Sequence, residues 1–171
     1  MNAQSQPSQR FSGSPEYLVT SRNRIANWAR SRSLWPLSFG TACCSMEMLA
    51  AVGGRFELGQ VTGGDLVVSP HHADLMIVSG RISLKMIPVL EEVHARIPEP
   101  KWVLAMGACA ISGGVFTSYA TVQGIDTILP VDGYVAGCPP RPEDLVDAVR
   151  LLRQDIRKPT YQKLPTAANR R

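Results

Sequence analysis

The chain has 171 residues, of which 44% are hydrophobic and 19% are charged, a balance that suits one globular domain with a substantial core. Its 14 glycines and 13 prolines follow no period, which excludes collagen-like and coiled-coil structures. Four cysteines are too few for a disulfide-stapled secreted scaffold, and the polar start carries no apolar signal core. We therefore expect a protein of a reducing compartment.

The positive charge is concentrated at the two ends of the chain. Residues 1–33 and 150–171 contain 12 of the 18 basic residues but only 2 of the 14 acidic ones, so the central part is acidic. An acidic folded core argues against binding to nucleic acid, which needs Lys and Arg on the folded surface. The basic ends are predicted to bind acidic partner subunits or an anionic membrane surface, or simply to aid solubility.

Composition divides the chain into a flexible N-terminal tail, a folded domain and a basic C-terminal tail, over residues 1–18, 19–158 and 159–171. The folded domain is predicted to begin with an amphipathic helix over Val19–Ser33. Its apolar side carries Ile25, Trp28 and Ala29. Packing of this side against the domain's own core is the preferred interpretation, and docking on a membrane or a partner is the alternative.

Short apolar runs that stop at a glycine follow this helix, and they are Trp35–Gly40, Asp74–Gly80, Trp102–Gly107 and Thr127–Gly137. Helical periodicity is found over Met86–Ile97 and Glu143–Ile156. The second of these helices has a start signal, because Pro142 precedes two acidic residues. Alternating strands and helices predict an α/β domain with a mainly parallel sheet and crossover helices.

Every cysteine lies within a few residues of the carboxyl end of one of these runs, and the four are Cys43, Cys44, Cys109 and Cys138. Open parallel sheets bind ligands at the edge formed by the carboxyl ends of their strands, so we expect all four thiols to meet there. Because neighbouring residues of a regular strand point to opposite faces, the tandem Cys43-Cys44 pair is expected in a bent, irregular turn.

Several kinds of site could use four convergent thiols. Buried structural cysteines are the simplest reading, and disulfides are disfavoured in a reducing compartment. Structural zinc usually takes Cys-x2-4-Cys pairs, which this chain lacks. A 4Fe-4S cluster is larger than one zinc ion and accepts ligands from scattered loops, so the residues favour the cluster. Neither a dinucleotide fingerprint nor a P-loop motif occurs.

Three stretches give the chain a recognisable family resemblance. They read SLWPLSFGTACCSMEM over residues 33–48, PEPKWVLAMGAC over 98–109 and PVDGYVAGCPPRPE over 130–143. From about residue 22 to residue 157, the sequence resembles the B-type subunits of NADH-quinone oxidoreductases, the enzymes also called respiratory complex I. The tandem Cys-Cys is the specific mark, because the related small subunits of nickel-iron hydrogenases carry Cys-x-x-Cys instead.

The resemblance implies a flavodoxin-like fold that holds one 4Fe-4S cluster, called N2, on Cys43, Cys44, Cys109 and Cys138. It implies electron transfer to ubiquinone or menaquinone, coupled to proton translocation by the whole complex, with this chain inactive alone. The implied partners are four: the large hydrogenase-like subunit (D-type, or a fused C-D form), the ferredoxin-like subunit (I-type), the 30-kDa-type subunit (C-type) and one membrane subunit (H-type). The implied location is peripheral, on the cytoplasmic side of the bacterial inner membrane.

Positions that match the quinone chamber of this family are Trp35, Met46, Met48 and Arg55. The first three could equally be core residues. Departures from the family pattern lie in residues 60–64, in the His71-His72 pair and in residues 81–86. Two other functions stay open. One is the small subunit of a membrane-bound nickel-iron hydrogenase-like complex, and the other is a zinc-bound structural adaptor.

Overall fold

The computed structural model describes residues 22–56 and 58–158, so both predicted tails and the start of the predicted first helix lie outside the described residues. The longer elements in chain order are α1 (Arg22–Arg32), β1 (Pro36–Gly40), α2 (Ala42–Val52), α3 (Leu58–Thr62), β2 (Leu75–Ser79), α4 (Ile87–Arg96), β3 (Trp102–Met106), α5 (Ala108–Ser112), β4 (Gly133–Val135) and α6 (Pro142–Arg157). Single 3-10 turns occupy Pro70–His72, Leu84–Met86 and Ile125–Thr127.

The four strands form one parallel sheet in the order β1-β2-β3-β4. A parallel bridge joins Val67 to Leu37 of β1, and the Val67 N–H donates to the Pro36 carbonyl at 2.9 Å. Because β2 already occupies one side of β1, Val67 extends the sheet on the other side. After β1, the chain first pairs Val67 on one side of β1 and then places β2 on its other side. The order in which strands are added therefore reverses at β1, which makes a topological switch point between β1 and β2. The predicted parallel α/β fold of flavodoxin type is confirmed.

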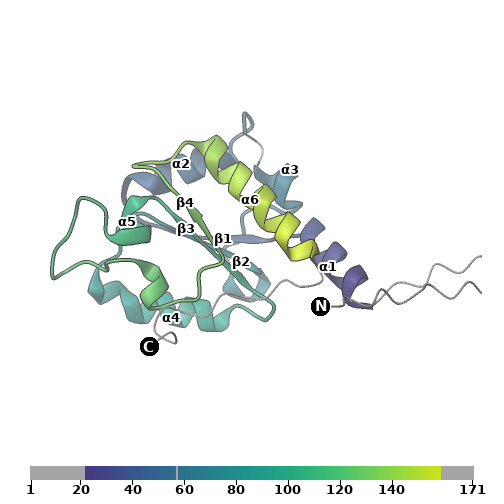
Figure 1. Ribbon diagram of the computed structural model, residues 1–171, viewed down its shortest axis with the longest axis horizontal. Helices are drawn as coiled ribbons and strands as arrows, with labels where there is room; N and C mark the ends of the chain where they lie inside the picture. Colours follow the sequence, from purple (N-terminus) through teal and green to yellow (C-terminus); the bar gives the residue numbers. More distant parts are fainter. Residues whose placement is uncertain (1–21, 57, 159–171) are drawn as a thin grey trace, which may run out of the picture.

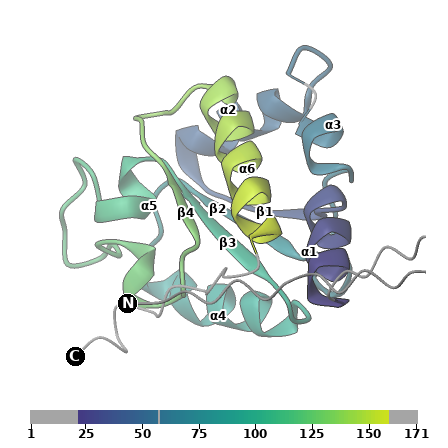
Figure 2. The same ribbon diagram turned by 45° about the vertical axis from the view of Figure 1, so that its right-hand side comes forward.

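Helices cover both faces of the sheet, as Figures 1 and 2 show. Side chains of α2, α3 and α6 pack on one face, in a core that includes Leu75 and Ile77 of β2. On the other face α4 and the segment after α5 pack against Met76 and Val78. Alternation along β2 thus assigns its residues to the two layers in turn. We call the first layer the α2/α6 face.

The two helices predicted from periodicity are confirmed as α4 and α6. The predicted apolar side of α6 is buried throughout, at Leu145, Val149, Leu152 and Ile156. Its start is also as expected, because α6 begins at Pro142 with Glu143 and Asp144 in its first turn. The Asp144 carboxylate also accepts the Arg141 N–H at 3.0 Å.

The apolar run Thr127–Gly137 is not a strand over its whole length, because only Gly133–Val135 is one. Asp132 explains the difference. Its carboxylate accepts the Val103 N–H at 2.8 Å, and its own N–H donates to the Val103 carbonyl at 2.8 Å, so strand pairing starts only after it. Leu129 and Val131, which precede it, are buried in the core as parts of an irregular connection.

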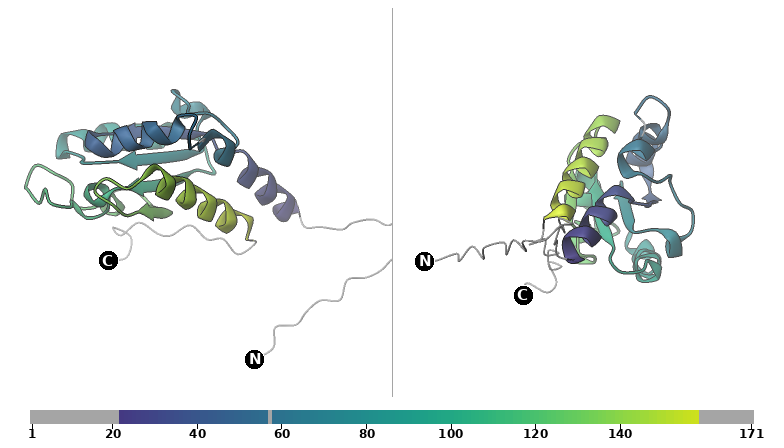
Figure 3. Two further views of the ribbon diagram at one scale, coloured as in Figure 1. Left: turned by 90° about the horizontal axis from the view of Figure 1, so that it is seen from above. Right: turned by 90° about the vertical axis from the view of Figure 1, so that its right-hand side faces the viewer.

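The expectation that the apolar side of α1 packs on its own domain is wrong. Ile25 and Trp28 are each 55% exposed. The helix is held instead at its C-terminal end, where the Arg153 Nε of α6 donates to the Ser31 carbonyl at 2.6 Å and the Arg157 Nε donates to the Ser31 hydroxyl at 3.0 Å. Figure 3 shows α1 at the margin of the molecule, beside the end of α6.

Candidate metal centre

All four cysteines lie at the carboxyl edge of the sheet, as predicted. Cys43 and Cys44 occupy the first turn of α2, Cys109 the first turn of α5, and Cys138 the loop after β4. Each is a free thiol; Cys44 and Cys109 are buried and the other two are exposed. The thiols therefore come from three separate elements of the fold.

Backbone hydrogen bonds tie these elements together beside the thiols. The Ala108 N–H donates to the Gly137 carbonyl at 2.8 Å, which joins the residues next to Cys109 and Cys138. The Thr41 N–H donates to the Ser79 carbonyl at 2.9 Å, which fixes the start of α2 to the end of β2. The thiol-bearing segments are thus held to the same edge.

The thiols influence one another electrostatically. Burial, reinforced by the neighbouring Cys43, Cys109 and Cys138 thiols, raises the pKa of Cys44 from 9.0 to about 11. Burial and the thiols of Cys138 and Cys43 likewise raise the pKa of Cys109. Negative charge on these sulfurs is therefore costly unless a bound cation compensates it.

The expectation of an irregular turn at Cys43-Cys44 is wrong, because both residues are helical. Adjacent residues of a helix are rotated by about 100° around its axis, so one cysteine can face the protein while the other faces outward. The irregular backbone conformation lies one residue earlier, at Ala42. Ala42 has a φ of +56°, the only positive φ at a non-glycine residue in the described parts of the chain.

Gly107, between β3 and α5, lets the backbone approach Cys44 closely. Its φ is +94°, and a Cβ at this position would lie 2.5 Å from the Cys44 Sγ. No side chain fits there without moving the sulfur. Only a glycine lets the backbone lie this close to the thiol.

The donor set fits a thiolate-bound metal group, with a restriction on its size. Among the described residues, no three His, Cys, Asp or Glu side chains are grouped closely enough to hold a single metal ion. Four cysteines without histidine are a ligand set for a structural zinc ion or for a 4Fe-4S cluster, and a cluster spans more space than one ion.

Arg81, just beyond the carboxyl end of β2, lies close to this site although it is not among the predicted site residues. Its positive charge lowers the pKa of Cys109, in opposition to burial. The guanidinium is stacked on the Phe116 ring, 4.5 Å from the ring centroid. The place of Arg81, two residues after the last β2 residue, is the signal that could have identified it.

The four residues matched to a quinone chamber are not gathered in one place. Met46 is 69% exposed on α2, whereas Met48 is completely buried in the core of the α2/α6 face. Trp35 lies before β1, at the amino edge of the sheet, where its indole N–H donates to the Ser33 hydroxyl at 3.1 Å. Arg55 is exposed beyond the end of α2, with its guanidinium 5.7 Å from the centroid of the Phe56 ring.

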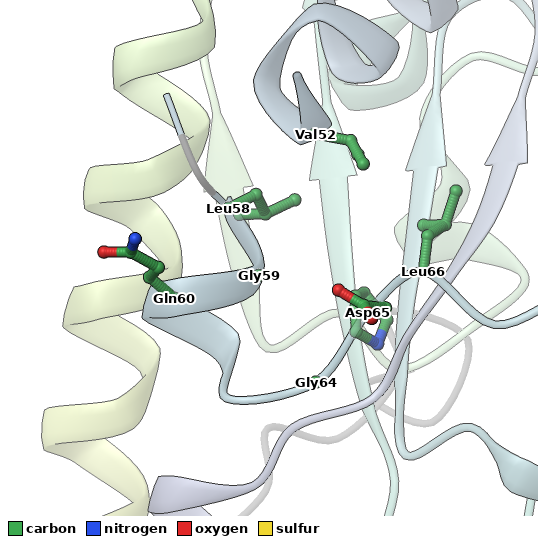
Figure 4. Close-up of a pocket in the computed structure, with 8 residues that line it drawn as sticks. Val52, Leu58, Gly59, Gln60, Gly64, Asp65 and Leu66 are labelled. Carbon is green, nitrogen blue, oxygen red and sulfur yellow. The ribbon is translucent and has the colours of Figure 1, made fainter. Parts of the chain in front are cut away.

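A cavity of about 320 Å³ lies at the C-terminal end of α2, lined by residues that neighbour Trp35 and Arg55 in the chain. Figure 4 shows the side chains of Val52, Leu58 and Leu66 directed toward one space, with Gln60 turned away from it. Pro36, which follows Trp35, also lines the cavity, and so does Gly64, whose backbone lies against the Trp35 ring. Its walls are mainly apolar, and Asp65 adds a carboxylate.

A second cavity, of about 250 Å³, contains the unusual histidine pair. His71 and His72 line it together with Arg30, Asp74 and Glu99. It lies at the amino edge of the sheet, because Asp74 immediately precedes β2. The two histidines are therefore at the end of the strands opposite the cysteines.

Comparison with known proteins places these features in a family. The family model described as "NADH ubiquinone oxidoreductase, 20 Kd subunit" matches residues 42–152. The B-type subunit of the NADH-quinone oxidoreductase of Rhodococcus opacus (strain B4) is 50% identical over 154 residues, which cover 90% of this chain and 81% of the relative. Its counterpart in Protochlamydia amoebophila (strain UWE25) is 48% identical over 141 residues, 82% of this chain and 86% of the relative.

Two solved structures share the fold of this chain. A chain of the membrane-bound sulfane sulfur reductase, an archaeal respiratory membrane complex, matches with a TM-score of 0.76 and 33% identity over 82% of this chain and 79% of that one. A [NiFeSe] hydrogenase chain from Desulfovibrio vulgaris Hildenborough matches with a TM-score of 0.52 and 17% identity over 72% and 61%, which shows a shared fold alone. The family model and the curated relatives confirm the resemblance seen in the sequence, and the chain belongs to the family of the 20 kDa, B-type subunits of NADH-quinone oxidoreductases.

Proposed function

We propose that this chain is the electron-relay subunit of an NADH-quinone oxidoreductase and that Cys43, Cys44, Cys109 and Cys138 bind one 4Fe-4S cluster. The observation that carries the proposal is the convergence of thiols from α2, α5 and the loop after β4 at one sheet edge, where Cys43, Cys109 and Cys138 add to the burial that raises the pKa of Cys44. When bound, such a cluster accepts and releases one electron at a time.

The residues of the chain supply an environment suited to this group. Cys43 and Cys44 lie at the N-terminus of α2, where the positive end of the helix dipole offsets part of the negative charge that a bound group brings. Burial of Cys44 and Cys109 keeps water from two of the four sulfurs. Arg81 supplies a positive charge that offsets part of the negative charge near Cys109.

The zinc-adaptor alternative is less well supported. A single zinc ion holds four ligands at about 2.0–2.3 Å, which requires a compact group of side chains. The described residues include no compact group of three candidate ligands. The four cysteines come from three separate elements and include no Cys-x2-4-Cys pair, which favours the larger group.

For the electron acceptor we propose a quinone that approaches the C-terminal end of α2. The cavity there is mainly apolar; Trp35 directly precedes its lining residue Pro36, and Arg55 lies in the chain between its lining residues Val52 and Leu58. With 11 residues, α2 spans about 16 Å between the thiols at its start and this cavity at its end. Arg55 is suited to donate a hydrogen bond to a quinone oxygen. Met48 is too deeply buried to contact a quinone, whereas Met46 is accessible.

The proposed assembly contains the large hydrogenase-like subunit, the ferredoxin-like subunit, the 30-kDa-type subunit and the H-type membrane subunit. Exposed apolar side chains next to the thiol edge support a protein partner there, since Val115 is 83% and Tyr119 95% exposed. In the described part of the chain, no helix is both long and apolar enough to cross a membrane. We propose a peripheral location, on the cytoplasmic side of the bacterial inner membrane.

Metal analysis of the anaerobically purified complex tests the cofactor. A cluster on this chain requires iron and acid-labile sulfide at about four each per chain, above the content of a complex that lacks this subunit. One zinc and no added sulfide would establish the adaptor function instead.

Electron paramagnetic resonance tests the ligands. Replacing any one of Cys43, Cys44, Cys109 or Cys138 by Ser is expected to abolish or strongly alter one reduced-cluster signal, because a hydroxyl is a poor substitute for a soft thiolate. An unchanged spectrum in one variant would remove that residue from the ligand set.

Arg55→Ala tests the quinone site. The variant is expected to retain the cluster signal and to reduce quinone more slowly. The control is Arg96→Ala on α4, where the guanidinium forms an exposed ion pair with Glu92 at the opposite face of the sheet. Equal turnover of the two variants would show that Arg55 has no part in quinone reduction.

A further inference from the structure

The hydroxyl of Ser79 is buried in the sheet without a partner. The residue is 0% exposed, and its Oγ has no hydrogen bond to any described residue. The other two buried polar residues of the described ranges are satisfied, since Ser31 donates to the Trp28 carbonyl at 2.8 Å and Thr62 to the Leu58 carbonyl at 2.9 Å. A buried hydroxyl without a hydrogen bond destabilises the fold, so its retention calls for a partner.

Ser79 occupies the centre of the thiol edge. It is the last residue of β2 and lies in register with Gly40 of β1 and Met106 of β3. β1 leads directly to Cys43 and Cys44, and β3 leads to Cys109. Ser79 is thus at the switch point, where a sheet of this type binds its ligand.

The side chain of Ser79 is on the same face as Cys44. Along β2, Leu75 and Ile77 face the α2/α6 core, so alternation directs Ser79 to that face as well. Its register partner Met106 belongs to the same core. Cys44 precedes the buried Met48 by one helical turn on α2 and is itself buried.

Close contact links this face to the thiol. Gly107, which follows Met106, approaches the Cys44 Sγ so closely that a Cβ there would be at 2.5 Å. The Ser79 hydroxyl and the Cys44 sulfur therefore occupy one end of one layer. The Ser79 hydroxyl can donate a hydrogen bond to sulfur, and no described residue accepts one from it.

We propose that Ser79 tunes the electron carrier: its hydroxyl donates a hydrogen bond to a sulfur of the cluster at Cys44 and raises the reduction potential. This inference rests on the proposed function. Reduction adds negative charge, so a donor aimed at sulfur stabilises the reduced form more than the oxidised form. Burial strengthens the effect, because the local dielectric is low.

The test compares wild type, Ser79→Ala and Ser83→Ala, each as the full chain within its native complex. Ser83→Ala is the matched control, since it removes a hydroxyl from the half-buried connection that follows β2. The signal to be titrated is the one that Cys44→Ser removes. Deuteron couplings to this signal are measured by electron-nuclear double resonance after exchange into D2O.

For Ser79→Ala we expect full iron content and the loss of one exchangeable deuteron coupling. We also expect the one-electron equilibrium to shift tenfold toward the oxidised form, which lowers the reduction potential by 59 mV. The control should match wild type in all three. An unchanged potential, a shift without loss of the coupling, or loss of the cluster from Ser79→Ala would each overturn the inference. Absence of the signal from wild type would instead overturn the proposed function.

Discussion

Replacing Gly107 by Ala should damage the thiol edge in a way that can be estimated from the structure. The backbone at Gly107, with φ +94° and ψ 152°, is in a region that costs an L-residue about 1–3 kcal/mol. The new Cβ would also lie 2.5 Å from the Cys44 Sγ. Normal carbon contacts start at about 3.5 Å, so the sulfur must move by about 1 Å.

The sulfur can move only by turning the Cys44 side chain away from its rotamer, which costs a further ~0.5–1.5 kcal/mol. The two effects together predict a loss of about 1.5–4.5 kcal/mol in the free energy of unfolding. A domain stable by about 5–15 kcal/mol would still fold. The displaced sulfur should, however, bind the cluster poorly, so iron content should fall as well.

The assays are urea unfolding of the full chain and iron analysis of the complex. Gly54→Ala is the matched control, because a Cβ at Gly54 meets nothing within 4 Å and its φ is not in the left-handed region. The control should change stability by no more than about 0.5 kcal/mol. If Gly107→Ala matched Gly54→Ala in both stability and iron, the close approach to Cys44 would have no importance for the site.

Two further predictions concern charged groups away from the thiols. Burial raises the pKa of Asp74 to about 6 against the hydrogen bond from the Trp35 N–H, so its ionisation destabilises the fold progressively as pH rises from about 4 to 6. Asp74→Asn should abolish this pH dependence and raise the free energy of unfolding at pH 7 by about 1 kcal/mol, a value already reduced for solvent screening. Thermal unfolding at pH 7 measures the change, and a variant less stable than wild type would show that the charge itself is needed. Arg153→Met removes hydrogen bonds to the Ser31 and Val61 carbonyls and should lower the free energy of unfolding in urea by about 2–4 kcal/mol. The control Arg150→Met breaks only an exposed ion pair with Asp147 and should lower it by under about 1 kcal/mol. Equal effects of the two variants would contradict the role of Arg153 in holding α1.

The sheet and the position of the thiols were predictable because both depend on local patterns. Apolar runs that end in glycine identify parallel strands, and cysteines placed after them must share the carboxyl edge. The helical state of Cys43 and Cys44 was missed although the sequence contains its signal. Ala, Met, Glu and Leu dominate residues 42–52, between Thr41 and the Gly53-Gly54 pair, and this composition favours a helix.

Other features could not be read from the sequence because they depend on distant contacts. A helical pattern with an apolar side does not reveal that arginines of α6 bind the end of α1 and leave Trp28 exposed. Met46 and Met48 are two residues apart on α2 and look equivalent, yet only Met48 faces the sheet. Ser79 is one polar residue in an apolar strand, and its unsatisfied state is visible only after its neighbours are placed.

The corner between β1 and α2 shows how the fold prepares this edge for negative charge. Thr41 is at the position where a Ser or Thr side chain usually caps a helix, but its hydroxyl makes no such cap. It donates instead toward the carbonyls of Ser79 and Arg81, at 2.9 and 2.8 Å. The corner is therefore fixed to β2 without using the N–H groups in the first turn of α2. These groups, which carry the positive end of the helix dipole, remain available beside Cys43 and Cys44, where thiolates need compensation.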